Sequence, residues 1–459
     1  MAMGRRKAER QAALFLPAGE LPKSPGHPFY QALNRLLAEA DFDRWAEDRC
    51  RAYYSTTETR GQPSLPPGVY FRMLFVGYYE GIGSQRGIAW RCADSFSIRE
   101  FLGLAADRNS PDHSTLSLTR TRLPPEVFQE VFQFVLQLAH AKQLLKGKTV
   151  GVDSTTLEAD AAMKSIVRRD TGEDWQAYVT TLMRAEGVIA ADEEPTEEDV
   201  RRFDKGRKDK TVSNEEWFNP YDPEAKITRM KDGTTHLAFK AEHVVDLDSD
   251  LIVAAEIRSA TDGDAQTLAD SVMQAQQNLR TIGSEQLIEE VAADKGYHSA
   301  DALELGRHLD FRTYIPEPKR TTDWTWTDKT PDHKRAVHGN RQRVRRRKGK
   351  QMQRRRSEVC ERTFAHVCNS GGMRRTWLKG LIDVTKRYLV ATAAHNLGRM
   401  LRTLFGVGKP RALQGFGGGS EAGSALESAL GRLFIALQAT LTGRSLRASA
   451  ALPQLALAS

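Results

Sequence analysis

The stretch EQLIEEVAADKGYHSADALELG, residues 285–306, joins an apolar run to an acid, a glycine and a helix start. The part QLIEEVAAD predicts a short strand that ends at Asp294. Gly296 lets backbone or ligand come close, and Ser299 is a suitable N-cap for the helix that follows. We therefore expect a strand, a tight turn and a helix, with a carboxylate at the strand end, where α/β proteins tend to build sites.

A second acid has the same setting. The run KTVGVDS, residues 148–154, predicts a short β-branched strand that ends in Asp153. If the two strands are parallel neighbours, their terminal carboxylates lie side by side and repel unless they are protonated or bridged by a cation. Mg²⁺ is the natural bridge, because it prefers carboxylate oxygens, water and phosphate oxygens.

A third acid is expected from a nearby helix. The segment RRRSEVCERTFAHV offers Glu358 and Glu361, one helical turn apart. Two metal ions held by carboxylates about 3.5–4 Å apart can activate an attacking oxygen and stabilise a leaving one in phosphodiester chemistry. The residue types therefore indicate a nucleic-acid backbone as the substrate.

The order of predicted elements from residue 148 to 400 is strand, helical insert, two strands, helix, strand, helix, strand and helices. This alternation favours a sheet covered by helices. The two adjacent strands meet at DLDSD, residues 246–250, which we interpret as a hairpin turn. Its acids are spaced as in a calcium loop, but Leu251 and Ile257 stand where such a loop needs glycine and glutamate.

Residues 27–145 have helical periodicity throughout. Gly81 and Gly83 break this region before SQRGIAWRCADS, which permits a helix-turn-helix with that segment as its second helix. A plain helical bundle is the alternative.

Positive charge is concentrated in one segment. The chain carries a formal charge of +8, yet residues 319–356 hold fifteen Lys and Arg against three acids, so the rest is slightly acidic. Contact with nucleic acid or phosphate is the expectation, and a solvated arm is the alternative. Trp324 and Trp326 precede the densest part and either stack on an unpaired base or pack in the protein.

Several protein classes are excluded by composition. The four cysteines form no CxxC pair, so neither a disulfide framework nor a structural zinc site is expected, and Cys360 is interpreted as helix packing. The N-terminal apolar run AALFL is too short for a signal peptide, and no segment reaches the length of a membrane span. We expect a cytoplasmic, nucleoid-associated protein with no membrane partner and no small-molecule cofactor.

Three segments also resemble a known family. VGVDSTTLEADA, VAADKGYHSADAL and RRRSEVCERTFAHV, followed by WLKGLIDVTKRYLVATAAHNLGRML, are similar to the signature blocks of bacterial insertion-sequence DDE transposases. The part from FLGL to NSPDHSTLSLTRTRLP resembles the helical domain that precedes the catalytic core in one large branch of them. The resemblance covers about residues 27–405, and the three blocks in order are highly specific.

The resemblance implies an α/β fold: an RNase H-like mixed sheet flanked by helices, with an N-terminal all-α domain and a helical insertion after the first core strand. The implied domains are a helical, DNA-binding domain at 1–145, a catalytic domain at 146–405 and a glycine-rich linker with a short helix at 406–459. The insertion spans about 156–235, and its role cannot be assigned from its residues.

The resemblance further implies cutting at transposon ends with two metal ions, Mg²⁺ or Mn²⁺ in its place, and joining of the freed 3′-hydroxyl to target DNA. Asp153, Asp294 and Glu361 are then the catalytic, metal-binding acids, and Glu358 is the alternative third acid. The implied partners are terminal inverted-repeat DNA, target DNA and further copies of the chain, in a homodimer or higher assembly. An RNase H-like nuclease that does not join DNA and a non-catalytic DNA-binding descendant are the alternatives, although three clustered acids argue against the latter.

The third block departs from some relatives, which place a Tyr and an Arg before the glutamate and a Lys after it. Ser357 and Cys368 stand in that region here. DNA contacts are therefore expected from other basic residues: Arg341, Arg343, Arg345, Arg346, Arg347, Lys348, Arg354, Arg355, Arg356, Arg374 and Arg375. Lys295, Tyr297 and His298, which follow Asp294, are candidate auxiliary residues.

Overall fold

The computed structural model describes residues 26–54, 64–105, 108–208, 212–230, 233–319, 326 and 329–410. The first 25 residues, most of the predicted linker and C-terminal helix at 406–459, and Trp324 lie outside the described residues.

The N-terminal region is helical, as the sequence predicts, and its helices surround an aromatic core. Its helices are α1 (Pro28–Glu39), α2 (Phe42–Cys50), the 3₁₀ turn η2 (Arg51–Tyr53), α3 (Pro67–Glu80), α4 (Gln85–Asp94), α5 (Phe96–Phe101), α6 (His113–Arg122) and α7 (Pro125–Ala141). A short turn joins α3 to α4, and the Ser84 hydroxyl accepts a hydrogen bond from the Gly87 N–H at 3.1 Å to cap α4. The two helices and the turn expected at Gly81 and Gly83 are therefore present, which fits both a helix-turn-helix and a plain helical bundle.

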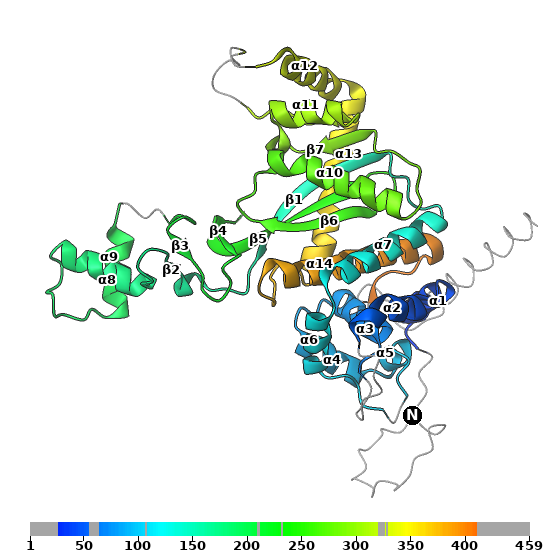
Figure 1. Cartoon of the computed structure of the whole chain (residues 1–459), viewed down its shortest axis with the longest axis horizontal. Helices are drawn as coiled ribbons and strands as arrows, with labels where there is room; N and C mark the ends of the chain where they lie inside the picture. Colours follow the sequence, from blue (N-terminus) through cyan, green and yellow to red (C-terminus); the bar gives the residue numbers. More distant parts are fainter. Residues whose placement is uncertain are drawn as a thin grey trace, which may run out of the picture.

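One mixed sheet forms the centre of the molecule (Figure 1). Its strands are β1 (Thr149–Glu158), β4 (Lys226–Arg229), β5 (Thr235–Asp246), β6 (Ile252–Ser259), β7 (Glu290–Ala293) and β8 (Arg312–Tyr314). The spatial order is β6, β5, β1, β7, β8, and β4 extends the β6 edge of β5. Strands β6, β5 and β1 run antiparallel, whereas β1, β7 and β8 run parallel. This is the RNase H-like core that the sequence predicts.

Helices cover both faces of the sheet. They are α10 (Asp264–Thr281), the 3₁₀ turn η4 (Lys295–Tyr297), α11 (Ala300–His308), α12 (Pro331–Arg345), α13 (Arg347–Phe364), the π-helical turn η5 (Ala365–Ser370) and α14 (Leu381–Phe405). Ser154 and its β5 neighbour Glu242 contact α10, whereas Asp153 and its neighbour His243 contact α13. Because successive strand residues point to opposite faces, α10 and α13 lie on opposite sides of the sheet (Figure 1).

The N-terminal helices are fixed to the sheet through α14. This helix buries residues along most of its length and packs against α7, α3 and β6. The Asn396 side chain accepts a hydrogen bond from the Ile252 N–H at 2.9 Å and donates one to the Ile252 carbonyl at 2.8 Å. The buried Asn396 side chain thus satisfies the backbone groups of Ile252 at the edge of β6. These hydrogen bonds link α14 to the sheet.

The insertion after β1 forms a lobe that projects from the sheet (Figure 1). It contains the 3₁₀ turn η3 (Met163–Ser165), β2 (Val167–Arg168), α8 (Trp175–Ala185), α9 (Glu197–Gly206) and β3 (Trp217–Phe218). Strands β2 and β3 pair antiparallel, and Val179, Met183 and Val200 form a small core of the lobe. The insertion is therefore helical, as predicted, with a two-stranded sheet in addition. None of the helices in the described ranges is long and apolar enough to cross a membrane.

Candidate functional site

Two of the predicted acids lie on neighbouring strands, but only Asp294 follows the end of its strand. The predicted strand end at Asp153 is wrong, because β1 continues to Glu158 through its pairing with β5. In the parallel pair β1–β7, Val152 lies opposite Ala293, and Asp153 and Asp294 are the next residues of the two strands. The parallel pairing on which the sequence argument depends is therefore present. It brings the two acidic positions side by side at the point where the pairing of β1 with β7 ends.

The carboxylate of Asp153 contacts helix α13. Its Oδ2 lies 3.0 Å from Nη1 of Arg356, and its Oδ1 accepts the Ser154 N–H at 2.9 Å. The side chain of Asp153 is 19% exposed and that of Arg356 is 9% exposed. An almost buried guanidinium therefore supplies positive charge at the first acid.

The carboxylate of Asp294 is held by the turn that follows it. Its Oδ1 accepts the Gly296 N–H at 2.7 Å and caps η4. A Cβ on Gly296 would lie 2.7 Å from Asp264 Oδ2 and 3.0 Å from Asp294 Oδ1, closer than side chains tolerate. Gly296 thus allows two carboxylates to approach the turn closely, and a larger residue would make at least one of them shift.

Helix α13 crosses the strands on the face of Asp153. Near β7, Gln353 Nε2 donates to the Ala293 carbonyl at 3.1 Å. The helix then passes Asp153 through Arg356 and reaches β5, where Thr363 Oγ1 lies 3.0 Å from His243 Nδ1. The side of α13 that faces the sheet is therefore fixed at three points.

The two candidate glutamates are three residues apart on α13, one turn along the helix and about 60° from each other around it. Glu361 is exposed and lies about 140° around the helix from Arg356, on the same flank as Ser357. Glu358 forms ion pairs with Arg355, at 3.7 Å, and with Arg362.

The Glu358 flank faces the opposite end of the sheet. Arg355 Nε donates to the Leu247 carbonyl at 3.0 Å, beside the β5–β6 hairpin, and Glu358 lines a pocket with Thr149 at the start of β1. Glu361 lies about 60° around the helix from Glu358, on the side of Ser357 and away from Arg355.

No ready-made metal cluster is present among the described residues: no three His, Cys, Asp or Glu side chains are grouped closely enough to hold an ion. The structure thus brings Asp153 and Asp294 to one edge but does not gather Glu361 with them. The donor set itself fits a hard divalent cation, because it consists of carboxylate oxygens.

Cys360, next to Glu361, is fully buried, and burial raises the pKa of its thiol with a further contribution from the negative charge of Asp153. A thiolate is therefore disfavoured, which agrees with a packing role for this residue.

The candidate auxiliary residues differ in exposure. Lys295 is exposed, whereas Tyr297 and His298 are buried. Burial raises the pKa of the Tyr297 hydroxyl, which keeps it protonated, and the Lys240 ammonium lies 5.9 Å from the Tyr297 ring centroid. The buried Tyr297 side chain therefore helps to fix the turn that follows Asp294.

Many of the predicted DNA-binding cations have partners inside the protein. These are Arg341 with Glu317 at 2.7 Å, Lys348 with Glu290, Arg355 with Asp250 at 3.1 Å, Arg374 with Thr155 at 3.1 Å and Arg375 with Glu158 at 3.7 Å. Arg343 donates to the carbonyl and hydroxyl of Thr313, and burial lowers its pKa. Such contacts indicate that part of the basic segment stabilises the fold.

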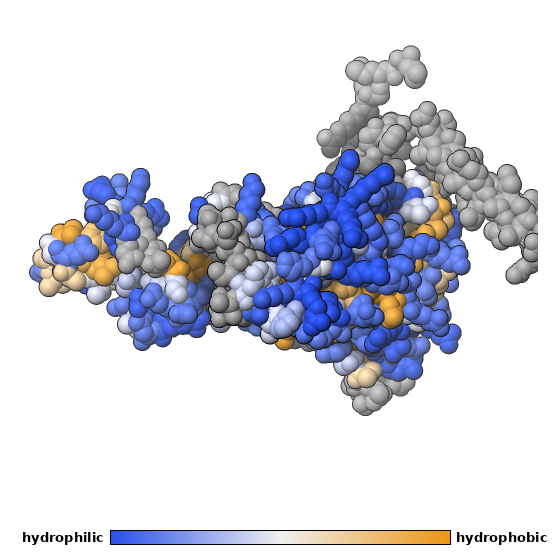
Figure 2. All heavy atoms as spheres, turned by 90° about the horizontal axis from the view of Figure 1, so that it is seen from above, coloured by the Kyte–Doolittle hydropathy of each residue, from blue (hydrophilic) through white to orange (hydrophobic). Residues whose placement is uncertain are grey.

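Other cations of the segment face solvent. Arg345, Arg346, Arg347 and Arg354 are exposed, and no side-chain ion pair is found for them within the described part of the chain. The surface seen from above in Figure 2 is largely hydrophilic where α12 and the start of α13 lie. Trp326, by contrast, is partly buried, and its ring stacks on His338 with centroids 5.2 Å apart.

Sequence reasoning did not single out two acids that the fold uses. Asp264 Oδ1 accepts a hydrogen bond from Ser154 Oγ at 3.0 Å and lies 2.7 Å from the Lys240 ammonium, on the α10 face. Asp250 binds the guanidinium groups of Arg355, Arg362 and Arg399. Neither acid closes a predicted strand, so the sequence carried no comparable signal.

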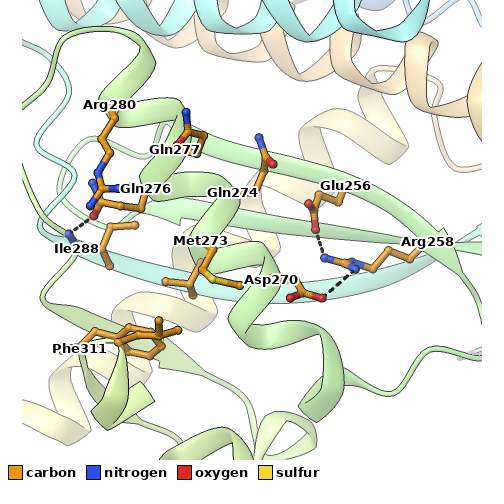
Figure 3. Close-up of a pocket in the computed structure, with 12 residues that line it drawn as sticks. Glu256, Arg258, Asp270, Met273, Gln274, Gln276, Gln277, Arg280, Ile288 and Phe311 are labelled. Atoms are coloured by element: carbon orange, nitrogen blue, oxygen red, sulfur yellow. Dashed lines mark hydrogen bonds and ion pairs between the residues drawn. The ribbon is translucent and has the colours of Figure 1, made fainter. Parts of the chain in front are cut away.

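A separate pocket lies on the α10 side of the sheet. It has a volume of about 640 Å³ and is lined by α10 and its neighbours, including Glu256, Arg258, Asp270 and Phe311 (Figure 3). None of the three predicted acids lines it.

Two family models match the chain. One is described as a transposase domain (DUF772) and matches residues 20–122, and the other is described as a transposase DDE domain and matches residues 319–401. No curated protein and no solved structure matches. The first match covers most of the N-terminal helices, and the second covers α12, α13 and α14 with Glu361. Together with the mixed sheet between them, these matches support an insertion-sequence DDE transposase.

Proposed function

We propose that this transposase cuts DNA at the ends of its element and joins the freed 3′-hydroxyl ends to target DNA, with Asp153, Asp294 and Glu361 as its catalytic acids. Members of the family generally use divalent metal ions. We assign two Mg²⁺ ions here, with Mn²⁺ as a substitute, because carboxylate oxygens are the donors these hard cations prefer.

The observation that carries the proposal is the pairing of β1 with β7. It places the positions of Asp153 and Asp294 side by side, and α13, which carries the exposed Glu361, crosses the sheet on the face of Asp153. Rotation of the long Glu361 side chain would add a third carboxylate. The bound metal would activate the attacking oxygen and stabilise the leaving oxygen of the phosphodiester.

The three acids and the exposed arginines have different roles in the proposed reaction. Asp153 is held from α13, Asp294 is oriented by the Gly296 N–H, and Glu361 approaches from solvent. Exposed Arg345, Arg346, Arg347 and Arg354 would bind the DNA backbone, since phosphate contacts position a nucleic acid without reading its sequence. Arg341, Arg343, Lys348, Arg355, Arg356, Arg374 and Arg375 would have to leave their present partners to do so.

We assign the remaining parts by the same reasoning. Residues 1–145 would bind terminal inverted-repeat DNA, with α4 as a candidate groove helix, and residues 146–405 would carry out catalysis. A homodimer or higher assembly would hold two ends together, and the protein would act at the nucleoid.

The test is metal-dependent nicking of duplex DNA that carries the sequences flanking the coding region. Asp153→Asn, Asp294→Asn and Glu361→Gln are expected to abolish nicking while DNA binding in a gel-shift assay is retained. Glu358→Gln, on the same helix, is the matched control and should nick at close to the wild-type rate. Full nicking by any of the three acid variants would remove the assignment.

A strand-transfer assay separates joining from cutting. Joined product in Mg²⁺ is expected for the wild-type protein. Cleavage without joining would favour an RNase H-like nuclease, and binding without metal-dependent cutting would favour a non-catalytic DNA-binding descendant.

A further inference from the structure

Arg356 and Asp153 form an ion pair at the place where the proposed function needs a metal ion. Arg356 Nη1 lies 3.0 Å from Asp153 Oδ2, and Nη2 donates to the Ser357 hydroxyl at 2.9 Å. Arg356 Nε is buried and has no hydrogen-bond partner in the described part of the chain. The guanidinium is thus largely shielded from water, although only part of its hydrogen-bonding capacity is used.

The position of Arg356 is constrained by packing. A Cβ on Gly151, two residues before Asp153 and on the same face of β1, would lie 3.1 Å from Arg356 Cγ. The stem of the arginine therefore lies against the bare backbone of β1, and its charged group reaches Asp153. Packing therefore fixes the geometry of this ion pair, in contrast to a surface ion pair between two mobile side chains.

Other buried acids of the core have their own cations. Lys240 lies 2.7 Å from Asp264, and Asp250 binds three arginines. The cation of Asp153 differs in one respect, because its acid is also the one that the proposed function assigns to a divalent ion. A guanidinium 3.0 Å from Oδ2 and a metal ion about 2.1 Å from the same oxygen cannot both be accommodated without repulsion.

We propose that Arg356 is an internal counter-cation that neutralises Asp153 in the metal-free protein and competes with the divalent ion for its carboxylate. This inference rests on the proposed function, because it takes Asp153 as a metal ligand. The competition lowers the apparent affinity for metal, since part of the binding free energy is used to break the ion pair. It also stabilises the metal-free fold, because a partly buried carboxylate without a partner is costly.

Thermal unfolding in the absence of DNA tests this. The melting temperature is measured for the full chain against the concentration of Mn²⁺ or Mg²⁺, starting from EDTA. Arg356→Met should melt below the wild-type protein in EDTA, show a larger rise on metal addition, and reach half of that rise at about tenfold lower metal concentration.

Arg399→Met is the matched control. Arg399 is also a partly buried arginine, with Nη2 2.9 Å from Asp250 and a buried Nε that has no partner among the described residues. This variant should melt at lower temperature without any change in the half-saturating metal concentration. An equal change in both variants would mean that loss of stability alone shifts the metal response, and it would overturn the inference.

Asp153→Asn distinguishes failure of the site from failure of the inference. If this variant keeps the wild-type response to metal, the ion does not bind at Asp153, and the proposed metal site fails. If it loses the response while Arg356→Met binds metal no more tightly than the wild-type protein, the site stands and the role of Arg356 is wrong. Arg356→Lys, which keeps a cation but offers a single point charge, serves if the Met variant does not fold. Its half-saturating concentration should lie below the wild-type value, and an equal or higher value would contradict the proposal.

Discussion

Gly151 of β1 and Cys360 of α13 meet where the helix crosses the strand: a Cβ on Gly151 would lie 3.0 Å from Cys360 Sγ. The same Cβ would be 2.8 Å from Leu247 Cδ2, so the strand is enclosed by side chains at this point. Because Gly151 has no side chain, α13 approaches the sheet closely enough for Arg356 to contact Asp153. A single glycine thus sets the distance between the two elements that carry the first and third acids.

Gly151→Val is expected to destabilise the protein by about 1–3 kcal/mol, because the added carbons would force neighbouring side chains out of their places. Urea unfolding measures the change. Gly206→Ala is the control, since a Cβ there meets nothing within 4 Å and the position lies at the end of α9. This control should change the free energy of unfolding by no more than about 0.5 kcal/mol.

Gly296→Ala should lower the nicking rate by about a hundredfold with a smaller effect on stability. The new Cβ would displace Asp264 Oδ2, which Lys240 holds, or the Asp294 carboxylate, and a misplacement of about 1 Å can cost that factor. Nicking kinetics and thermal unfolding are measured together. Gly263→Ala, where the nearest atom lies at an ordinary 3.5 Å, should retain both properties. A Gly296→Ala protein with wild-type kinetics would show that the turn does not position Asp294.

Stability should fall as the pH is lowered below about 6.5. His243 is fully buried, and desolvation lowers its pKa from 6.5 to about 3, so the folded protein keeps it neutral. The unfolded chain binds the proton first, which favours unfolding between these two values. The loss from His243 alone is about 2 kcal/mol at pH 5. Burial also lowers the pKa of His366 to about 4 and lowers that of His395, and both act in the same direction.

The check is urea unfolding of His243→Gln between pH 7 and 5. The variant should start less stable, because His243 contacts Thr363 and Tyr388, but its free energy of unfolding should fall less steeply with decreasing pH. His308→Gln, at an exposed ring, should keep the wild-type slope. An unchanged slope for His243→Gln would mean that this ring does not carry the effect.

Replacing Arg345, Arg346 and Arg347 together by Ala should weaken duplex binding and reduce its salt dependence. Each lost phosphate contact lowers the slope of log K against log salt by about 0.9. Fluorescence anisotropy at several salt concentrations measures that slope. Arg343→Ala should instead lower the melting temperature and leave the slope unchanged, because its guanidinium is bound to Thr313. The reverse pattern would exchange the roles assigned to these residues.

The sequence predicted the elements whose signals are local. The Ser299 hydroxyl caps α11 by accepting the Ala302 N–H at 3.0 Å, Gly296 is at a close approach, and the acids of residues 246–250 form a hairpin turn, as expected. The pairing of β1 with β7 was conditional in the sequence, since periodicity does not fix which strands are neighbours. Family resemblance supplied that connection.

The contacts of the charged side chains could not be predicted from the sequence. A run of arginines has the same appearance whether it faces solvent or binds buried acids. Arg347 is exposed whereas Arg356, nine residues further, is buried against Asp153, because the helix presents one to water and the other to the sheet. The three arginines at Asp250 come from two helices, so their convergence depends on tertiary packing alone.

The lobe departs from the sheet after β1 and returns through β4 and β5, and Glu158 is still paired with Ala238 where the chain leaves. The two ends of the lobe are therefore held together by the pairing of β1 with β5. We therefore expect that the lobe can become longer or shorter without a change in the pairing of β1 with β5 that holds Asp153.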